Sequence, residues 1–471
     1  MKKTLVFIMS AAIFFTACKK DNNEDDQLVE DLQYSLKFTN PIDNYEVALG
    51  SKVMLCIEPD DNMSYYDYEK HFYIDNQEVN LSEIDVNNID NIYYNNYAFE
   101  WNVTGLSLGN HTLKVEMVND GTIEARDEIT VNIVNPRWEE IDISTLTGGD
   151  DYYINDVFLL NDHTGWIAGY NSNGTKFLLK TTDKGATWQI VNNSLSIEKI
   201  AFYNENTGVA IADVGKVYKT FDGGNSYFLV TDPATGASLF YDAYDVAFSQ
   251  MAGEYQVTSP DINGNNKVFR VSLTDNDIIQ YTDVMPNSSQ LLYEIKFDAA
   301  NGLIYGMEED ATDLQYIQLS SNNGLNWQGV AIPAPSDWFG GNNNFQVEGG
   351  AISGNKIWLT GGDNSDYLSA FSAVSNDAGN TWNILEVDNK LAFDTTSLFD
   401  VAIADNGAYA INSSAKYQPA MYFSDNDGNS WKPLYEVTTP TEDQHINFVA
   451  FKGSDFGIAT GEGVLYRFIS N

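Results

Sequence analysis

Five short segments of the chain combine a hydroxyl, a carboxylate or amide, a glycine and an aromatic residue at fixed spacing. They read TTDKGATW, TFDGGNSY, SSNNGLNW, SNDAGNTW and SDNDGNSW, and they begin at residues 181, 220, 320, 375 and 424. A carboxylate beside hydroxyl groups could act as a general acid or base. The same residue types also suit a tight turn, because Asp and Asn accept hydrogen bonds from nearby backbone N–H groups and glycine adopts positive φ.

The exchange of Asp for Asn between the copies separates these two interpretations. The acidic position is Asp183, Asp222 and Asp377 in three copies, but Asn322 and Asn426 in the other two. An amide still accepts hydrogen bonds in a turn, whereas it cannot serve as a carboxylate acid or base. We therefore predict a structural turn in each copy, with the aromatic residue packed between sheets. The other residues of these predicted turns are Gly185, Trp188, Gly224, Tyr227, Gly324, Trp327, Gly379, Trp382, Gly428 and Trp431.

The spacing of the copies predicts a repeated β fold. Consecutive copies begin 39 to 55 residues apart, except for one gap of 100 residues that fits two units, one of which lacks the motif. Short apolar segments separated by turn residues fill each unit, which is typical of a β-propeller with four strands per blade. Six units can be followed, and a seventh ends one strand short. We predict that 136–144 supplies that strand, so that 136–471 forms a seven-bladed propeller.

The repeated motif resembles the Asp-box, or BNR repeat, of sialidases, the sortilin family and relatives of the photosystem II assembly factor. The resemblance covers about 335 residues. It implies a propeller whose boxes connect the third and fourth strands of each blade, with ligands on the face opposite the boxes. It implies no single activity, because one fold carries many functions.

The arginines argue against sialidase activity. Sialidases clamp a substrate carboxylate with three converging arginines, whose planar guanidinium groups bind it bidentately. This chain has four arginines in all: Arg126, Arg137, Arg270 and Arg467. Arg126 lies in the first domain, Arg137 and Arg467 belong to the predicted outer strands of the last blade, and only Arg270 could face the axis. Because no triad can be assembled, we do not expect a sialidase.

Other catalytic or metal chemistry has little support in the sequence. A neutral-glycan hydrolase needs two carboxylates about 5–10 Å apart, and a chain with 67 acidic residues contains such pairs by chance. The candidates are Asp150 with Asp151, Asp242 with Asp245, and Asp363 with Asp366. The four histidines show no metal-ligand spacing. We predict no catalytic residue, no metal and no cofactor.

We expect ligand-binding residues in the loops on the face opposite the predicted turns. Several of these loops are longer than a blade connection needs. Their aromatic residues stand among Asn, Asp and Gly, a mixture that suits sugars and protein interfaces alike. The candidates are Tyr152, Tyr153, Tyr241, Tyr244, Trp338, Phe339 and Tyr367, of which Trp338 and Phe339 are the sharpest.

The first residues predict export and lipidation. Two lysines precede an apolar run over 5–15, which is too short to span a membrane as a mature helix. The following FTAC, ending at Cys18, resembles a bacterial lipobox, whose cysteine becomes the lipidated N-terminus. We predict a signal peptide over 1–17 and a tether over 18–33. The acidic residues of that tether resemble the surface-export signal of Bacteroidetes lipoproteins, which predicts an outer-membrane protein facing the exterior.

Between the tether and the repeats, 34–135 alternates polar and apolar residues in segments of strand length. This pattern predicts a β-sandwich of immunoglobulin-like or PKD type. The net charge of −42 disfavours nucleic acid as a partner. A hydrophobic content of 43% and an aromatic content of 13% indicate a folded, all-β protein.

These observations favour a non-catalytic cell-surface lipoprotein that binds a glycan or a partner protein on the propeller face. One alternative is a glycoside hydrolase acting on neutral polysaccharide. Another is an assembly or scaffold factor for an outer-membrane complex, as the resemblance to the photosystem factor implies.

Overall fold

The computed structural model describes most of the chain after residue 31. The described ranges are 32–63, 68–84, 97–249, 251, 253–261, 263–274, 278–283, 294–306, 316–332, 345–363, 370–387, 398–412, 420–437 and 445–469. Cys18, Trp338, Phe339, Tyr367 and Asp366 lie outside them. Apart from the short helix α1 (Ser144–Thr147), the regular structure in these ranges consists of strands, which confirms the prediction of an all-β protein. In this part of the chain, no helix is long and apolar enough to cross a membrane.

The first part of the chain forms two sheets over a shared core. Their strand orders are β1-β3-β7-β6 and β2-β9-β8-β4-β5. The strands are β1 (Leu36–Asn40), β2 (Tyr45–Ala48), β3 (Lys52–Pro59), β4 (Glu69–Ile74), β5 (Gln77–Val79), β6 (Ser82–Ile84), β7 (Tyr97–Asn102), β8 (Gly109–Asn119) and β9 (Thr122–Val134). Leu113, Val115 and Met117 alternate along β8 and enter the same core as Leu55 and Ile57 of β3, as the period of two in a strand requires.

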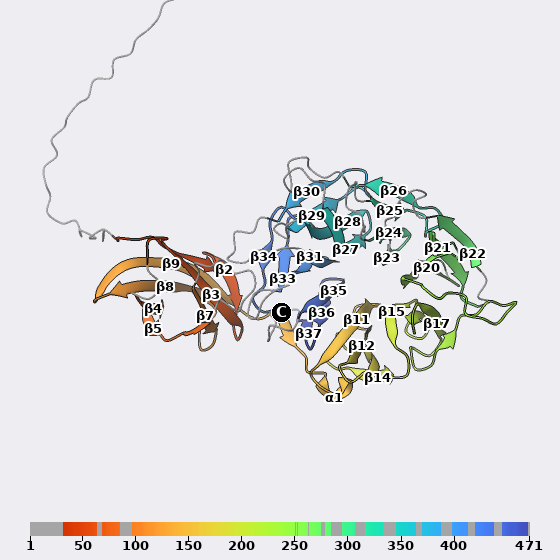
Figure 1. Cartoon of the computed structure of the whole chain (residues 1–471), viewed down its shortest axis with the longest axis horizontal. Coiled ribbons are helices and arrows are strands. Elements are labelled where there is room, and N and C mark those ends of the chain that lie inside the picture. The colour runs from red at the N-terminus through yellow and green to blue at the C-terminus, as the bar shows by residue number, and fades with distance from the viewer. Residues whose placement is uncertain are drawn as a thin grey trace, which may run out of the picture.

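Seven four-stranded sheets make up the second part of the described chain, arranged around a common centre in Figure 1. The first three contain β11 (Tyr152–Leu159), β12 (Gly165–Asn171), β13 (Lys176–Thr181) and β14 (Gln189–Asn192); β15 (Ile197–Phe202), β16 (Gly208–Ala212), β17 (Lys216–Thr220) and β18 (Phe228–Leu229); and β19 (Asp245–Ala247), β20 (Glu254–Pro260), β21 (Asn266–Ser272) and β22 (Ile278–Asp283). The third of these sheets lies in the long gap between the second and third copies of the motif.

The next three sheets follow the same order along the chain. They contain β23 (Glu294–Asp298), β24 (Asn301–Tyr305), β25 (Tyr316–Ser320) and β26 (Gln328–Ala331); β27 (Phe345–Ser353), β28 (Lys356–Asp363), β29 (Ala370–Ser375) and β30 (Asn383–Glu386); and β31 (Leu398–Ala404), β32 (Gly407–Asn412), β33 (Met421–Ser424) and β34 (Lys432–Pro433). The first strands of neighbouring sheets contact one another in cyclic order, and β35 (Ile446–Lys452) contacts β11.

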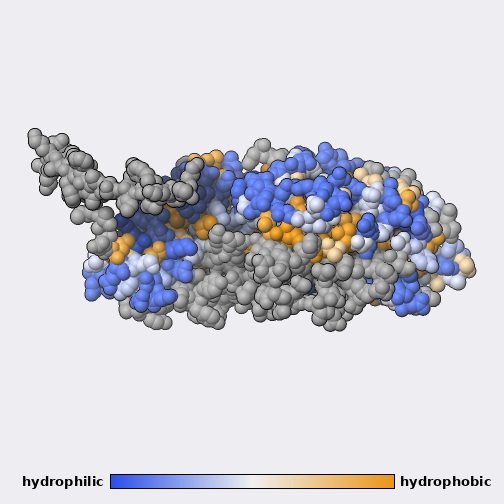
Figure 2. Space-filling model, turned by 90° about the horizontal axis from the view of Figure 1, so that it is seen from above, coloured by the Kyte–Doolittle hydropathy of each residue, from blue (hydrophilic) through white to orange (hydrophobic). Residues whose placement is uncertain are grey.

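The last sheet joins segments from both ends of this part. It contains β35, β36 (Phe456–Gly461), β37 (Leu465–Phe468) and β10 (Trp138–Glu140), and β10 pairs antiparallel with β37. Trp138 of β10 packs edge-on against Phe451 and Phe468. In Figure 2, where the molecule is seen from above, hydrophilic residues cover much of the described surface, with hydrophobic residues showing between them.

The five repeated segments form turns that satisfy their own polar groups. In the first copy, Asp183 Oδ1 accepts the backbone N–H of Thr187 at 2.9 Å and Asp183 Oδ2 accepts its hydroxyl at 2.6 Å. The Gly185 N–H donates to Thr181 Oγ1 at 3.0 Å. In the Asn copies the amide oxygen takes the same place, as in the 3.0 Å hydrogen bond from Ser430 to Asn426 Oδ1. Local hydrogen bonding therefore accounts for the residue types in these turns.

The backbone of these turns is left-handed at two consecutive residues. The five motif glycines have φ between 72° and 100°. The residue before each glycine also has positive φ, including Ala378 at 57°. A Cβ at Gly379 would stand 2.3 Å from Leu319 Cδ1 of the neighbouring sheet. Both the conformation and the close approach therefore require glycine at this position.

The two parts of the chain are joined by a buried contact. Tyr435 follows β34, yet its side chain belongs to the core of the first part and is 1% exposed. Its hydroxyl donates to Asn40 Oδ1 at 2.6 Å. Beside it, the Arg137 guanidinium lies 3.2 Å from Glu436 Oε1 and 3.3 Å from Glu46 Oε2. The first part is therefore packed against the second rather than attached only through a linker.

Candidate functional site

The structure separates the predicted ligand-binding tyrosines into two groups. Tyr152 is 3% exposed and packs against Phe177 in the core. Its ring cannot meet a ligand, so its assignment as a binding residue was wrong. Tyr152 and Tyr153 are neighbours in β11 and their side chains point to opposite faces of the strand, which explains why only one of them is buried. Tyr153, Tyr241 and Tyr244 all retain exposed area.

Two of the accessible tyrosines, Tyr153 and Tyr241, belong to a connected surface. The rings of Tyr153 and Tyr170 are stacked with centroids 5.3 Å apart. Lys176, which pairs with Tyr170, reaches to 4.0 Å from Asp213 of the next sheet. Asp213 begins the β16–β17 turn, and the glycine of that turn lies against the backbone of Tyr241. We call the partly exposed Tyr153 and the exposed Tyr170, Val214 and Tyr241 the tyrosine face.

The tyrosine face lies at the sheet ends opposite the motif turns. Strand β13 begins at Lys176, beside Tyr170, and ends at Thr181, where the first motif turn begins. The motif turns share their end of the sheets with the turns after the first strands, since Lys184 N donates to His163 O at 3.1 Å. Trp338, Phe339 and Tyr367, predicted on the same side as the tyrosine face, remain predictions.

The arginines of the second part lie apart and face carboxylates of the protein itself. Arg270 of β21 donates from Nε to Glu254 at 3.1 Å and from Nη1 to Gln280 at 2.9 Å. Arg467 donates to Glu139 at 2.8 Å. Arg137 contacts Glu436 and Glu46, as described above. These guanidinium groups therefore do not converge on a substrate position.

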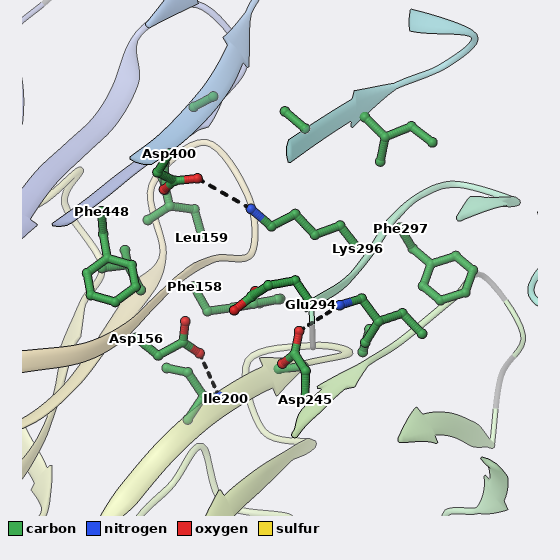
Figure 3. A pocket seen from close by; sticks show the side chains of 18 of the residues that line it. Asp156, Phe158, Leu159, Ile200, Asp245, Glu294, Lys296, Phe297, Asp400 and Phe448 are labelled. Carbon is green, nitrogen blue, oxygen red and sulfur yellow. Dashed lines mark hydrogen bonds and ion pairs between the residues drawn. The ribbon is translucent and has the colours of Figure 1, made fainter. Parts of the chain in front are cut away.

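A cavity of about 740 Å³ runs along the centre of the seven sheets. Its wall is made by the first strands β11, β15, β19, β23, β27, β31 and β35, together with Tyr305 of β24. Charged side chains project into it, as Figure 3 shows for Asp156, Asp245, Glu294, Lys296 and Asp400. We call these five residues together with Lys199 the axial layer.

Three carboxylates of the axial layer form hydrogen bonds that connect neighbouring sheets. Asp156 Oδ2 accepts the backbone N–H of Ile200 at 2.7 Å (Figure 3), and Asp245 Oδ2 accepts that of Ile295 at 2.8 Å. Asp400 Oδ2 accepts the N–H of Val449 at 3.0 Å in the same way. Each bond joins one first strand to the next, so these carboxyl groups are held in fixed orientations.

Two lysines bridge sheets that are not neighbours. Lys199 Nζ donates to Glu294 Oε1 across the intervening β19. Lys296 Nζ lies 3.7 Å from Asp400 Oδ1, across β27 (Figure 3). At the register position of Lys199 and Asp400, β27 carries Gly349, whose Cβ would stand 2.7 Å from the Asp400 backbone. The lysines can therefore reach across the axis.

The carboxyl groups of the axial layer have different pKa values, although they share one environment. Burial raises the pKa of Asp156 to about 6, although the Lys199 ammonium favours its ionised form. Burial, and then the charge of Glu294, raise the pKa of Asp245 well above its ordinary value. Burial also opposes ionisation of Glu294, but Lys199 and Lys296 hold its pKa below the ordinary value. The surroundings thus favour the protonated forms of Asp156 and Asp245 and the ionised form of Glu294 within one layer.

Sequence reasoning missed the axial layer, although a signal was present. Six of the first strands contain the similar segments NDVF, EKIA, YDVA, YEIK, FDVA and NFVA. In each segment the third residue is Val or Ile, and the second residue is the one of interest. Five of these residues are charged, at Asp156, Lys199, Asp245, Glu294 and Asp400, and the sixth is Phe448. A charge repeated at one register position of successive buried strands indicates a common axis. Within the described residues, no group of His, Cys, Asp and Glu side chains has the geometry of a metal site.

The comparisons with known proteins identify the fold. No protein-family model and no curated protein matches the sequence. The solved structure of YCF48 bound to a D1 peptide matches with a TM-score of 0.50 at 15% identity, over 71% of this chain and 96% of that chain. YCF48 from Cyanidioschyzon merolae gives 0.49 at 15% identity, over 71% and 98%. The β-propeller domain of the Trilobed protease from Pyrococcus furiosus gives 0.41 at 8% identity, over 66% and 92%.

The chain is therefore a β-propeller protein, which confirms the fold predicted for its repeats. The arrangement of four-stranded sheets and the similarity to the peptide-bound YCF48 structure both carry this conclusion. Because the sequence identity to this structure is only 15%, the similarity supports a shared fold and nothing more.

Proposed function

We propose that this protein is a non-catalytic, lipid-anchored cell-surface protein that holds a partner protein on the tyrosine face of a seven-bladed propeller. The observation that carries the proposal is the exposure of this face. Tyr170 is 39%, Val214 77% and Tyr241 56% exposed. Large apolar side chains gathered on one exposed surface are typical of interaction sites, and tyrosine is enriched in protein interfaces.

A protein ligand fits this face better than a glycan. Val214 offers neither an aromatic ring nor a hydrogen bond to a sugar, and it stands at φ 67° on the tip of the β16–β17 turn. A β-branched residue in that conformation carries a strain that a purely structural turn would avoid. The YCF48 neighbour, which shares the fold, is bound to a D1 peptide. A partner protein that presents an extended segment is the ligand we propose.

The motif turns have a structural role in this proposal. Their carboxylate and amide oxygens accept hydrogen bonds from the turns themselves, as in the 2.8 Å bond from the Thr381 N–H to Asp377 Oδ1. Arginines that could clamp a substrate are spread over separate strands. Both features support a binding protein rather than a glycosidase of the sialidase type.

The N-terminal segments would set the position of the propeller. In this proposal 1–17 is removed, Cys18 carries the lipid, and 18–33 is the tether that leads to an immunoglobulin-like sandwich. The buried contact of Tyr435 with that sandwich supports a fixed orientation of the propeller relative to its anchor. A rigid sandwich would hold the tyrosine face away from the membrane instead of letting the propeller swing.

A photo-crosslinking amino acid at position 241 tests the proposal in the native cell. The control position is 228, where Phe228 is 57% exposed on the outer strand β18 and away from the tyrosine face. We expect a protease-sensitive adduct at 241 and none at 228. An adduct that is lost on glycosidase treatment would instead identify a glycan. Equal adducts at both positions, or none, would refute the proposed face, and release of sugars from neutral polysaccharides would refute the non-catalytic assignment.

A further inference from the structure

The axial layer contains more negative than positive side chains. Four carboxyl groups, on Asp156, Asp245, Glu294 and Asp400, face two ammonium groups, and Glu348 adds a further carboxyl group to the cavity wall. Lys199 is engaged with Glu294, and Lys296 with Asp400. Lys199 also attracts Asp156 and Asp245, so one ammonium group serves three carboxyl groups.

The backbone fixes the orientation of Asp156 and Asp245, and both share the Lys199 ammonium group with Glu294. Asp156 and Asp245 each accept a backbone N–H from the next sheet, at 2.7 and 2.8 Å. Burial raises the pKa values of both groups and so favours their protonated forms. The charged groups that act on Asp156 are Lys199 of β15 and Glu294 of β23. A cation brought by a ligand would neutralise the excess negative charge without those protons.

An aromatic ring completes the layer. Phe448 of β35 occupies the register position that Asp156 and Asp400 occupy in the two neighbouring first strands. Figure 3 shows its ring at the same cavity, together with Phe158 and Phe297. Carboxylates that face an aromatic ring in a partly dry site are the groups that recognise an ammonium or guanidinium ion.

The cavity is large enough for an extended side chain and leads to the surface. Volumes of about 300–1,000 Å³ are usual for ligand sites. From the axial layer the wall continues to the ends of the first strands, on the side of the motif turns, where Tyr203 is 40% exposed. Asp298 and Lys452 stand at this end with opposite charges.

We propose that the axial cavity binds the guanidinium or ammonium group of a basic side chain carried by a peptide ligand. The charge lies beside Asp156 and the Phe448 ring, and the aliphatic stem lies along the phenyl-lined wall. This site is separate from the tyrosine face and does not depend on the function proposed for that face.

A pair of matched peptides tests the site by calorimetry at 150 mM salt and pH 7. One is acetyl-Gly-Gly-Arg-Gly-Gly-amide, and the other carries citrulline in place of arginine, which keeps the shape but removes the charge. We expect the citrulline peptide to bind at least about tenfold more weakly, because hydrogen bonds between charged groups are much stronger than neutral ones. Equal binding of both peptides, or no binding of the arginine peptide at millimolar concentration, would overturn the proposal.

Variants then locate the site on the protein. Asp156→Asn and Phe448→Leu should each weaken the arginine peptide severalfold, whereas Glu128→Gln, which removes one charge from the exposed surface of the sandwich, should leave it unchanged. At pH 6, binding to the parent should release protons, and Asp156→Asn should reduce that release. An unchanged affinity in both cavity variants, or the same loss in Glu128→Gln, would show nonspecific attraction to an acidic protein. Crosslinking at position 241 is a separate readout, so failure of either site leaves the other testable.

Discussion

Replacement of Tyr435 by alanine should uncouple the two parts of the chain. Tyr435 lies after β34 but is fully buried in the core of the sandwich. A buried aromatic side chain covers roughly 150–250 Å², and at about 25 cal/mol per Å² its removal costs about 4–6 kcal/mol. Measured truncations of buried aromatic residues cost a similar 3–5 kcal/mol. We expect Tyr435→Ala to destabilise the protein by about 3–5 kcal/mol.

The hydroxyl of Tyr435 can be tested apart from its ring. It donates to Asn40 Oδ1, while the Asn40 amide donates to the carbonyl oxygen of Met54. Tyr435→Phe keeps the ring and leaves the Asn40 oxygen without this donor, which should cost about 1–2 kcal/mol. The two variants together divide the contact into an apolar and a polar contribution.

Differential scanning calorimetry and limited proteolysis can show whether the sandwich and the propeller still unfold together. The parent should melt with sandwich and propeller in one transition, because each part buries surface of the other. In Tyr435→Ala, a second transition should appear at a lower temperature, and the junction near residue 136 should become accessible to protease. Tyr241→Ala, which removes an exposed tyrosine, is the control and should melt like the parent. A single, nearly unchanged transition in Tyr435→Ala would show that the contact does not couple the two parts.

Three further predictions concern other segments. Gly379→Val should lower the free energy of unfolding by several kcal/mol, since φ is 84° and a Cβ would meet Leu319; a denaturation midpoint like the parent's would contradict the structural role of the turn. The pKa of Asp156 is raised from 3.8 to about 6 in the folded protein, so its contribution to stability is present at pH 4 and is lost as the pH rises through 6. Between pH 4 and pH 7, the free energy of unfolding of Asp156→Asn, measured by urea denaturation, should therefore rise by up to about 3 kcal/mol relative to that of the parent. A difference between the two proteins that is independent of pH would contradict this. Cys18→Ala should leave the protein unlabelled by a radioactive fatty acid and free of the membrane fraction, whereas normal labelling of the variant would disprove lipidation at that residue.

The sequence alone was informative where a structure depends on residues close together in the chain. The hydroxyl, the Asp or Asn and the glycine of each motif turn lie within five residues, so their hydrogen bonds and their positive φ follow from local chemistry. The repeat spacing then predicted the β-propeller, because every unit must contain the same short strands around the same turn. At Ala378, however, the residue type did not reveal the positive φ that the turn imposes.

Only the tertiary structure decided which side chains meet. Tyr152 and Tyr153 have the same type and adjacent positions, yet one belongs to the core, because burial depends on which face of β11 packs against its neighbours. The axial layer brings together residues from 156 to 400, and Tyr435 meets Asn40 across 395 positions. Such contacts arise from the closing of successive sheets around one axis and from the packing of the sandwich against them. No local pattern specifies them, since the partner of each group is fixed by the arrangement of whole sheets.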